Sequence, residues 1–88
     1  MTIEQAVGQV VRAKRKALNW TLAKLAAKSG TSLGYLSQIE TGWYRPTLKK
    51  LKIVSEALFS TLTEVIREAE ALIPVVVDTT AVERELEV

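Results

Sequence analysis

The stretch TLAKLAAKSGTSLGYLSQIETG, residues 21–42, decides the fold because it encodes two short helices joined by a tight turn. The first helix follows the hydroxyl of Thr21, a good N-cap, and runs to about residue 29. Gly30 then adopts positive φ freely, where a Cβ would cost about 1 kcal/mol or more. Thr31 and Ser32 offer an N-cap for the second helix, which covers about residues 33–41 and ends at Gly42. We therefore predict two helices packed closely around a glycine turn.

Apolar residues at helical spacing predict three further helices outside this stretch. One covers residues 3–18, carries cations in its last turns and ends at Asn19, which tolerates the left-handed conformation. Another begins after Thr47 and has an apolar side made of Leu48, Leu51, Val54, Ala57 and Leu58. The last begins at Thr61 with capping-box spacing and ends before a proline. The sequence thus predicts an all-α domain of five helices over residues 1–73.

The pattern changes in the C-terminal tail, residues 74–88. Residues 75–77 are three β-branched valines, residues 78–80 are turn-like, and residues 82–88 carry a glutamate at every second position, on one side of an extended chain. This pattern predicts two short strands. Because an isolated hairpin is marginal in water, the strands would need the helical body, a second subunit or a further domain. The tail is interpreted as a dimerisation element or as the start of a larger domain.

Composition narrows the class of protein. Apolar residues make up 48% and charged residues 25% of the chain, a balance typical of a globular domain. Cysteine and histidine are both absent, so the usual zinc ligand sets, the commonest general base and the commonest strong nucleophile are missing. No run approaches a membrane span, and the N-terminus lacks a signal-peptide pattern. We expect a cytoplasmic protein that is not an enzyme and needs no metal, cofactor or membrane.

The net charge of +2 hides two halves of opposite sign. Residues 1–60 carry ten lysines and arginines against three glutamates, a net +7. Residues 61–88 carry two arginines against seven acidic residues, a net −5. This division favours a domain that presents one face to phosphates and keeps another face away from them, although an ordinary solvated surface gives the same count.

Residues 7–65 resemble the Cro and phage-repressor family of helix-turn-helix proteins, also called the Xre family. The resemblance lies in an arginine-rich first helix, the pattern T-x-x-x-L-A, the glycine turn, Y-L-S-x-I-E-x-G, R-P-T-L and an apolar fourth helix. It implies that the helix over residues 33–41 enters the major groove of DNA, with its N-terminal end toward the bases. It also implies that the following loop and helix start hold the sugar-phosphate backbone.

The resemblance and the side-chain chemistry together predict two sets of DNA contacts in this sequence. The expected base-reading residues are Leu33, Gly34, Tyr35, Ser37 and Gln38. The expected phosphate-binding residues are Thr21, Thr31, Ser32, Thr41, Trp43, Tyr44, Arg45 and Lys49. Two alternatives stay open: Leu33 and Tyr35 can instead be partly buried, and Trp43 or Tyr44 can pack against the core or a partner.

Glu40 is the only acid among residues 5–55, on a surface otherwise suited to DNA. In the resembling family a glutamate here pairs with an arginine of the first helix, which in this chain is Arg15. Such a pair would fix the recognition helix and leave the other edge of the guanidinium for a phosphate. A catalytic role for Glu40 lacks a partner acid or nucleophile.

The sequence therefore indicates a transcriptional regulator that binds double-stranded DNA, most simply a repressor that recognises an inverted repeat as a homodimer. The expected dimer contacts are Leu72, Val75, Val77, Val82 and Leu86. The alternative is a protein-interaction module, such as an antitoxin or adaptor, that keeps the helix-turn-helix shape without reading DNA.

Overall fold

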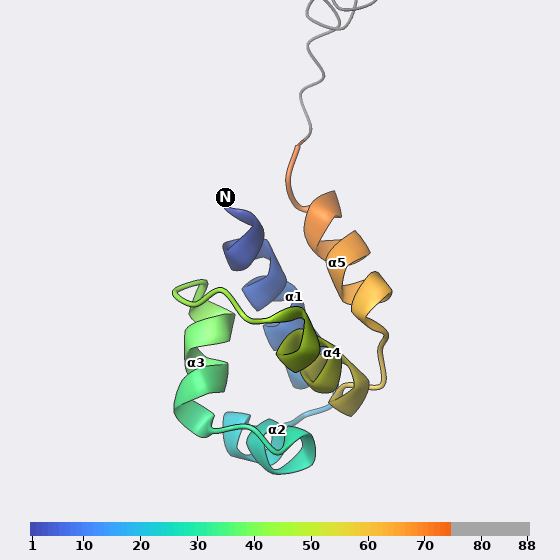
Figure 1. Ribbon diagram of the computed structural model, residues 1–88. Helices are drawn as coiled ribbons and strands as arrows, with labels where there is room; N and C mark the ends of the chain where they lie inside the picture. Colours follow the sequence, from blue (N-terminus) through green and yellow to red (C-terminus); the bar gives the residue numbers. More distant parts are fainter. Residues whose placement is uncertain (75–88) are drawn as a thin grey trace, which may run out of the picture.

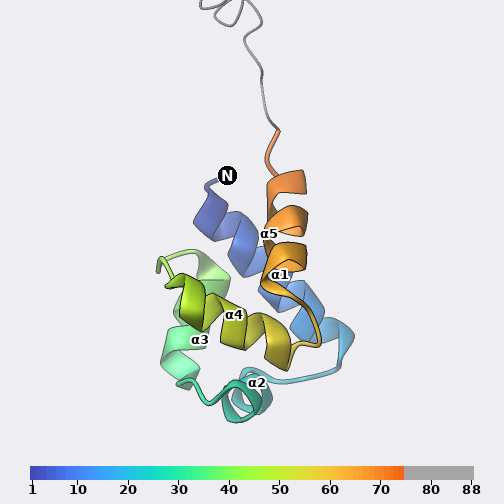
Figure 2. The same cartoon turned by 45° about the vertical axis from the view of Figure 1, so that its right-hand side comes forward.

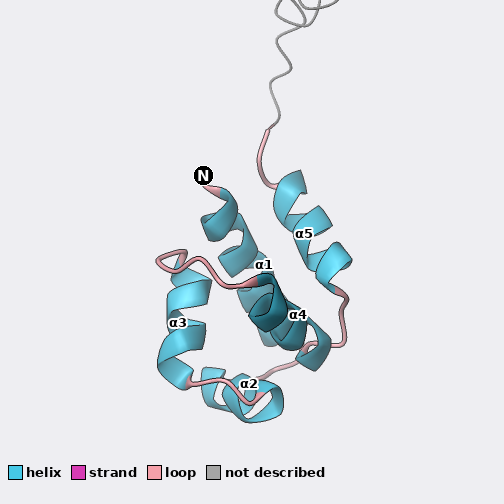
Figure 3. Cartoon of the chain, viewed as in Figure 1, coloured by secondary structure: helices cyan, strands magenta, loops and turns pink. Residues whose placement is uncertain are grey.

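The computed structural model describes residues 1–74 and arranges them as a bundle of short helices (Figures 1 and 3). In chain order the helices are α1 (Ile3–Ala17), α2 (Leu22–Ser29), α3 (Leu33–Thr41), α4 (Leu48–Ala57) and α5 (Leu62–Ala71). The described residues contain no strand, which confirms the all-α prediction. The strands expected in the tail lie outside the described residues.

Each helix begins at a hydroxyl residue whose backbone is extended. The N-caps are Thr2, Thr21, Ser32, Thr47 and Thr61. Each side chain accepts a hydrogen bond of 3.0–3.1 Å from the backbone N–H three residues later. Because a helix leaves its first N–H groups without partners, these caps set where every helix starts.

Left-handed residues set where most of the helices end. Asn19, Gly30 and Gly42 have φ of 58°, 65° and 78°, as the sequence predicts. Phe59, after α4, has φ of 61°, which the sequence analysis did not predict because a bulky residue rarely adopts this conformation. The chain therefore turns sharply after α1, α2, α3 and α4.

The core lies between α1 and the other helices. The view in Figure 1 and the turned view in Figure 2 place α3 and α5 on opposite sides of the bundle, and α1 packs against both. The buried apolar residues are Ala6, Val7, Val10, Val11, Leu25, Leu36, Ile39, Leu51, Val54, Leu58, Val65 and Ala69. An ion pair of 2.8 Å between Lys14 and Glu68 adds a polar contact between α1 and α5. The first helix is thus the common support of the domain.

The structure differs from the expected elements at Leu48. Leu48 was expected on the apolar side of the fourth helix, but its relative exposure is 71%. Leu48 is the first residue of α4, and its side chain still lies in solvent, whereas Leu51, one turn later, is buried in the core. The fifth helix ends at Ala71 with Leu72 as its C-cap, before Pro74, as the sequence predicts. No helix in residues 1–74 is long and apolar enough to cross a membrane.

Candidate nucleic-acid interface

The third helix is held against α1 by unusually close backbone packing. Leu36 and Ile39 point into the core with 0% and 1% exposure. A Cβ built on Gly8 would lie 2.3 Å from the carbonyl oxygen of Ile39 and 2.6 Å from that of Glu40, so only glycine fits there. The sequence analysis missed Gly8, although a glycine inside a strongly helical stretch is a signal of such close approach. The position of α3 therefore depends on a residue of α1 that has no side chain.

A buried ion pair fixes the same end of α3. Arg15 Nε donates to Glu40 Oε2 at 2.7 Å, and Arg15 Nη2 donates to Glu40 Oε1 at 2.9 Å. The two side chains are 10% and 6% exposed. The hydrogen bond to Glu40 raises the pKa of Arg15, while desolvation by burial lowers it, so the guanidinium stays charged. The structure thus brings together the two residues that the resemblance pairs.

The edge of Arg15 that was expected to meet a phosphate has a partner within the protein. Nη1 of Arg15 donates to the carbonyl oxygen of Trp20 at 2.7 Å, and this bond links α1 to the start of α2. With Nε, Nη1 and Nη2 each bonded within the protein and the side chain buried, Arg15 joins three segments of the protein.

The opposite side of α3 is open to solvent. Its exposed residues are Leu33, Gly34, Ser37, Gln38 and Thr41. At about 100° per residue these five lie within an arc of about 140°, opposite the buried Leu36 and Ile39. Leu33 is 51% exposed, which argues against the interpretation that it is a core residue. Four of the five predicted base-reading residues therefore share one exposed face.

The fifth, Tyr35, is half-buried at the edge of this face. Its ring makes an edge-to-face contact with Tyr44, with centroids 5.2 Å apart. Burial raises the pKa of Tyr35, the nearby Tyr44 raises it further, and the backbone of Thr47 lowers it in part. The Tyr35 hydroxyl consequently stays protonated at neutral pH and remains a hydrogen-bond donor.

The loop after α3 is fixed to the helix it follows. The N–H of Gly42 donates to the carbonyl of Ile39, and the N–H of Trp43 donates to that of Gln38, both at 3.1 Å, which is the Schellman pattern. A Cβ on Gly42 would lie 2.7 Å from Cγ of Gln5, so the loop also touches the first turn of α1. The Trp43 side chain is 87% exposed, so its packing on the core of this chain is excluded.

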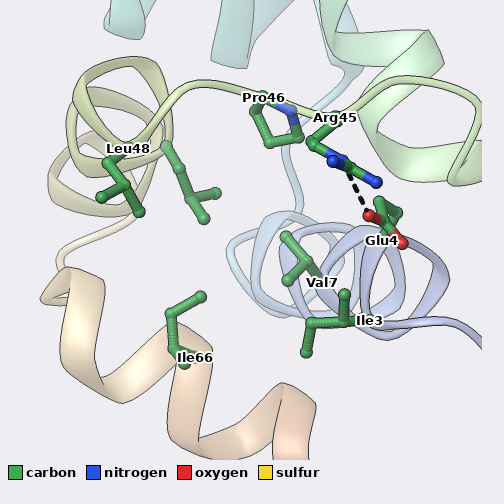
Figure 4. A pocket seen from close by; sticks show the side chains of 8 residues that line it. Ile3, Glu4, Val7, Arg45, Pro46, Leu48 and Ile66 are labelled. Atoms are coloured by element: carbon green, nitrogen blue, oxygen red, sulfur yellow. Dashed lines mark hydrogen bonds and ion pairs between the residues drawn. The ribbon is translucent and has the colours of Figure 1, made fainter.

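Arg45 lies further along the same loop, against the start of α1 (Figure 4). Its Nε forms an ion pair of 3.1 Å with Glu4 Oε1, while its side chain is 86% exposed. A backbone hydrogen bond at the helix start lowers the pKa of Glu4, and Arg45 lowers it further, so Glu4 stays ionised. The ion pair occupies Nε of Arg45, and the exposed guanidinium keeps Nη donors for an anion.

The remaining predicted phosphate contacts surround the exposed face of α3. Thr21 and Ser32 are exposed N-caps, and Lys49 is exposed in the first turn of α4. The Thr31 hydroxyl shares a hydrogen bond of 2.7 Å with Ser29. The Thr41 hydroxyl donates to the carbonyls of Ser37 and Gln38 at 3.0 and 3.2 Å. Apart from the half-buried Thr31, these residues can be reached from solvent.

The sequence analysis also missed Arg12. This exposed arginine of α1 lines a hollow between α1, α2 and α3, formed with Arg15, Leu22, Ser37, Glu40 and Thr41. Its position one turn before Arg15 was the available signal, because residues three apart on a helix share a side. The exposed guanidinium of Arg12 therefore lies beside the exposed face of α3.

The acidic residues of α5 lie on the other side of the bundle from α3. Glu64, Glu68 and Glu70 are exposed on α5, which packs against α1 and α4. Of the five expected dimer contacts, Leu72 lies within the described residues. It is the C-cap of α5 and is 45% exposed. Val75, Val77, Val82 and Leu86 lie outside the described residues. The exposed side of α3 thus faces away from the acidic helix.

Comparisons with known proteins agree with this geometry. A family described as Helix-turn-helix matches residues 11–65. The chain is 41% identical over 59 residues to the HTH-type transcriptional regulator SlrR of Bacillus subtilis, covering 66% of this chain and 39% of that protein. It is 39% identical over 62 residues to the Immunity repressor protein of Bacillus phage phi105, covering 70% of this chain and 43% of that protein.

A solved structure is similar over most of the bundle. The crystal structure of the clp gene regulator ClgR from C. glutamicum has a TM-score of 0.77 and 32% sequence identity, covering 81% of this chain and 91% of that chain. The chain spans about two fifths of the length of SlrR and of the phage repressor. The matched segment, residues 11–65, contains α2, α3 and α4 complete. The chain belongs to the Cro and phage-repressor (Xre) family of helix-turn-helix proteins.

Proposed function

We propose that this protein is a sequence-specific transcriptional regulator that binds double-stranded DNA by placing α3 in the major groove. The observation that supports this most is the exposed face of α3, Leu33, Gly34, Ser37, Gln38 and Thr41, on a helix fixed from behind. An α-helix with its side chains is about 10–12 Å across, and the major groove is about 12 Å wide. A rigid helix with an uncovered face fits that groove.

The chemistry of this face suits base edges. Gln38 can pair bidentately with adenine, and Leu33 can contact a thymine methyl group. Gly34 has no atom within 4 Å of the position of a Cβ, so nothing of the protein prevents its backbone from approaching the DNA closely. Tyr35, held by Tyr44 and protonated, can donate to a base edge or a phosphate. Because two of these residues are apolar or lack a side chain, DNA shape contributes to recognition.

Phosphate contacts surround this face. Arg45 and Lys49 follow α3, Arg12 stands at the end of the hollow between α1 and α3, and Thr21, Thr31 and Ser32 lie at the starts of α2 and α3. Helix N-termini and exposed cations both attract phosphate oxygens. Thr41 and Tyr44 complete the set of phosphate contacts near the loop, and Trp43 lies in the same loop.

We further propose that residues 1–73 form the DNA-binding domain and that the protein acts in the cytoplasm as a homodimeric repressor on an inverted repeat. One recognition helix reads only a few base pairs, so two copies a helical turn apart give usable specificity. The names of SlrR and of the phage repressor support regulation of transcription. Leu72 and the tail residues 74–88 would supply the dimer contact.

Gln38→Ala is expected to relax sequence preference at one base pair of each half-site. The change removes a bidentate contact worth about 1–3 kcal/mol of discrimination against the wrong base. Binding of the selected duplex and of single-base variants, measured by titration, checks this. A variant that keeps the full preference of the wild type would mean that Gln38 reads no base.

Arg45→Ala is expected to weaken binding to all duplexes alike and to lower the slope of log affinity against log salt by about 1. The physical reason is the loss of one phosphate contact and its released counterion. Arg67→Ala is the matched control, because Arg67 is exposed on α5, away from α3. An unchanged slope for Arg45→Ala would remove Arg45 from the interface, and an affinity nearly independent of salt would favour the protein-interaction alternative.

A further inference from the structure

Trp43 is the most exposed large hydrophobic residue in residues 1–74, with a relative exposure of 87%. The chain has one other tryptophan, Trp20, which is half-buried and packs against the core. An exposed tryptophan adds little to the stability of the fold, because an apolar ring stabilises a protein only when it is buried. Its position in this protein therefore needs an explanation other than stability.

The backbone of Trp43 is held in place while its side chain is free. Its N–H donates to the carbonyl of Gln38 at 3.1 Å, so the residue is attached to α3 itself. In a Schellman motif this position often makes a hydrophobic contact with the residue five positions before it. That residue is Gln38, a polar side chain, and Trp43 remains uncovered. The backbone thus holds Trp43 at the C-terminal end of α3, with its ring open to solvent.

The charges around Trp43 point to an anionic partner. Arg45 and Lys49 are exposed close by along the chain. Glu40 is paired with the buried Arg15 and Glu4 with Arg45 itself, so among these groups the exposed Lys49 carries the net positive charge. A partner that fits must carry negative charge and also offer an apolar surface for an indole ring. The sugar-phosphate backbone of DNA offers both, since deoxyribose rings lie between its phosphates.

We propose that Trp43 contacts DNA through the face of its indole ring, which packs on deoxyribose next to the groove that α3 occupies. This inference rests on the proposed function and adds to it a contact that is apolar and independent of sequence. Covering about 60 Å² of the ring, at about 25 cal/mol per Å², corresponds to about a tenfold gain in affinity. Such a contact releases no counterion, so it leaves the salt dependence unchanged.

Two variants and an internal control test this contact on a mixed-sequence synthetic duplex at low ionic strength. Trp43→Ala is expected to bind about tenfold more weakly, with the salt slope of the wild type. Trp43→Phe keeps an aromatic face without an indole N–H and is expected to recover most of the affinity. Because the Trp43 side chain is exposed, both variants should fold normally, which thermal unfolding verifies.

Tryptophan fluorescence gives an independent readout. In the wild type, duplex DNA should shift the emission to the blue and protect it from acrylamide, a neutral quencher. In Trp43→Phe, which retains Trp20 alone, both changes should disappear. Trp20 is bonded to Arg15 through its backbone, while Gly42, the neighbour of Trp43 in the chain, contacts Gln5; ten residues of α1, about 15 Å, separate Gln5 from Arg15, so Trp20 should not report on DNA bound at Trp43.

Three results would overturn the inference. If Trp43→Ala binds as tightly as the wild type, Trp43 has no contact with DNA, while the proposed function stands. If Trp43→Phe is as weak as Trp43→Ala, the indole N–H contacts a phosphate and the ring face is not used. If the wild type binds no duplex, the proposed function and this inference fail together.

Discussion

Glu40→Ala is expected to destabilise the domain by about 3–5 kcal/mol, because it leaves the buried charge of Arg15 without its partner. The two side chains share hydrogen bonds of 2.7 and 2.9 Å and are 10% and 6% exposed, so water cannot replace the lost carboxylate easily. Chemical denaturation followed by circular dichroism measures the loss. DNA binding should fall with it, since the pair fixes the C-terminal end of α3.

The matched control is the exposed pair of Lys52 and Glu56 on α4. Its Nζ and Oε1 atoms are only 2.6 Å apart, yet the side chains are 62% and 56% exposed. Glu56→Ala should therefore change stability by no more than about 1 kcal/mol. If both substitutions lower the free energy of unfolding by the same small amount, burial does not make the Arg15–Glu40 pair more important for stability than an exposed pair.

Gly8→Ala is expected to destabilise the domain by about 2 kcal/mol or more, although alanine is normally the better helix former. The new Cβ would lie 2.3 Å from a carbonyl oxygen of α3, and a backbone atom cannot rotate away. Either α1 and α3 separate, or the helix ends distort. Thermal unfolding measures the stability, and the variant should also bind DNA more weakly because α3 has moved.

Gly34→Ala is the control for Gly8→Ala. Gly34 is also a helical glycine, but no atom lies within 4 Å of its Cβ position. Without a clash, helix propensity alone predicts a gain in stability of about 0.5–1 kcal/mol. If both alanine variants gain stability, the close approach of α1 and α3 at Gly8 is wrong.

Local signals of the sequence predicted most of the helix limits. The N-caps at Thr21, Ser32, Thr47 and Thr61 and the left-handed turns at Asn19, Gly30 and Gly42 act within a few residues, so they can be recognised without the tertiary structure. The family resemblance named Leu33, Gly34, Ser37 and Gln38 as the DNA-facing side of α3, and the structure exposes that side while it buries Leu36 and Ile39. Local chemistry therefore defines the helix limits, and the resemblance identifies the exposed side of the third helix.

Features that depend on contacts between distant segments were not predictable in the same way. The contact of Gly8 with Ile39, the bond from Arg15 to the carbonyl of Trp20, and the ion pair of Arg45 with Glu4 all join different elements. Leu48 fits the apolar period of α4, but its first-turn position leaves it exposed. Such outcomes follow from how the helices pack, which one sequence does not specify.

Selection of bound duplexes from a random pool by the 88-residue chain, followed by footprinting, tests the central claim most directly. Binding through the exposed face of α3 by a homodimer predicts an enriched inverted repeat whose half-sites lie about 10 base pairs apart. A pool from which no sequence is enriched, together with no retention of any duplex at low ionic strength, would contradict it.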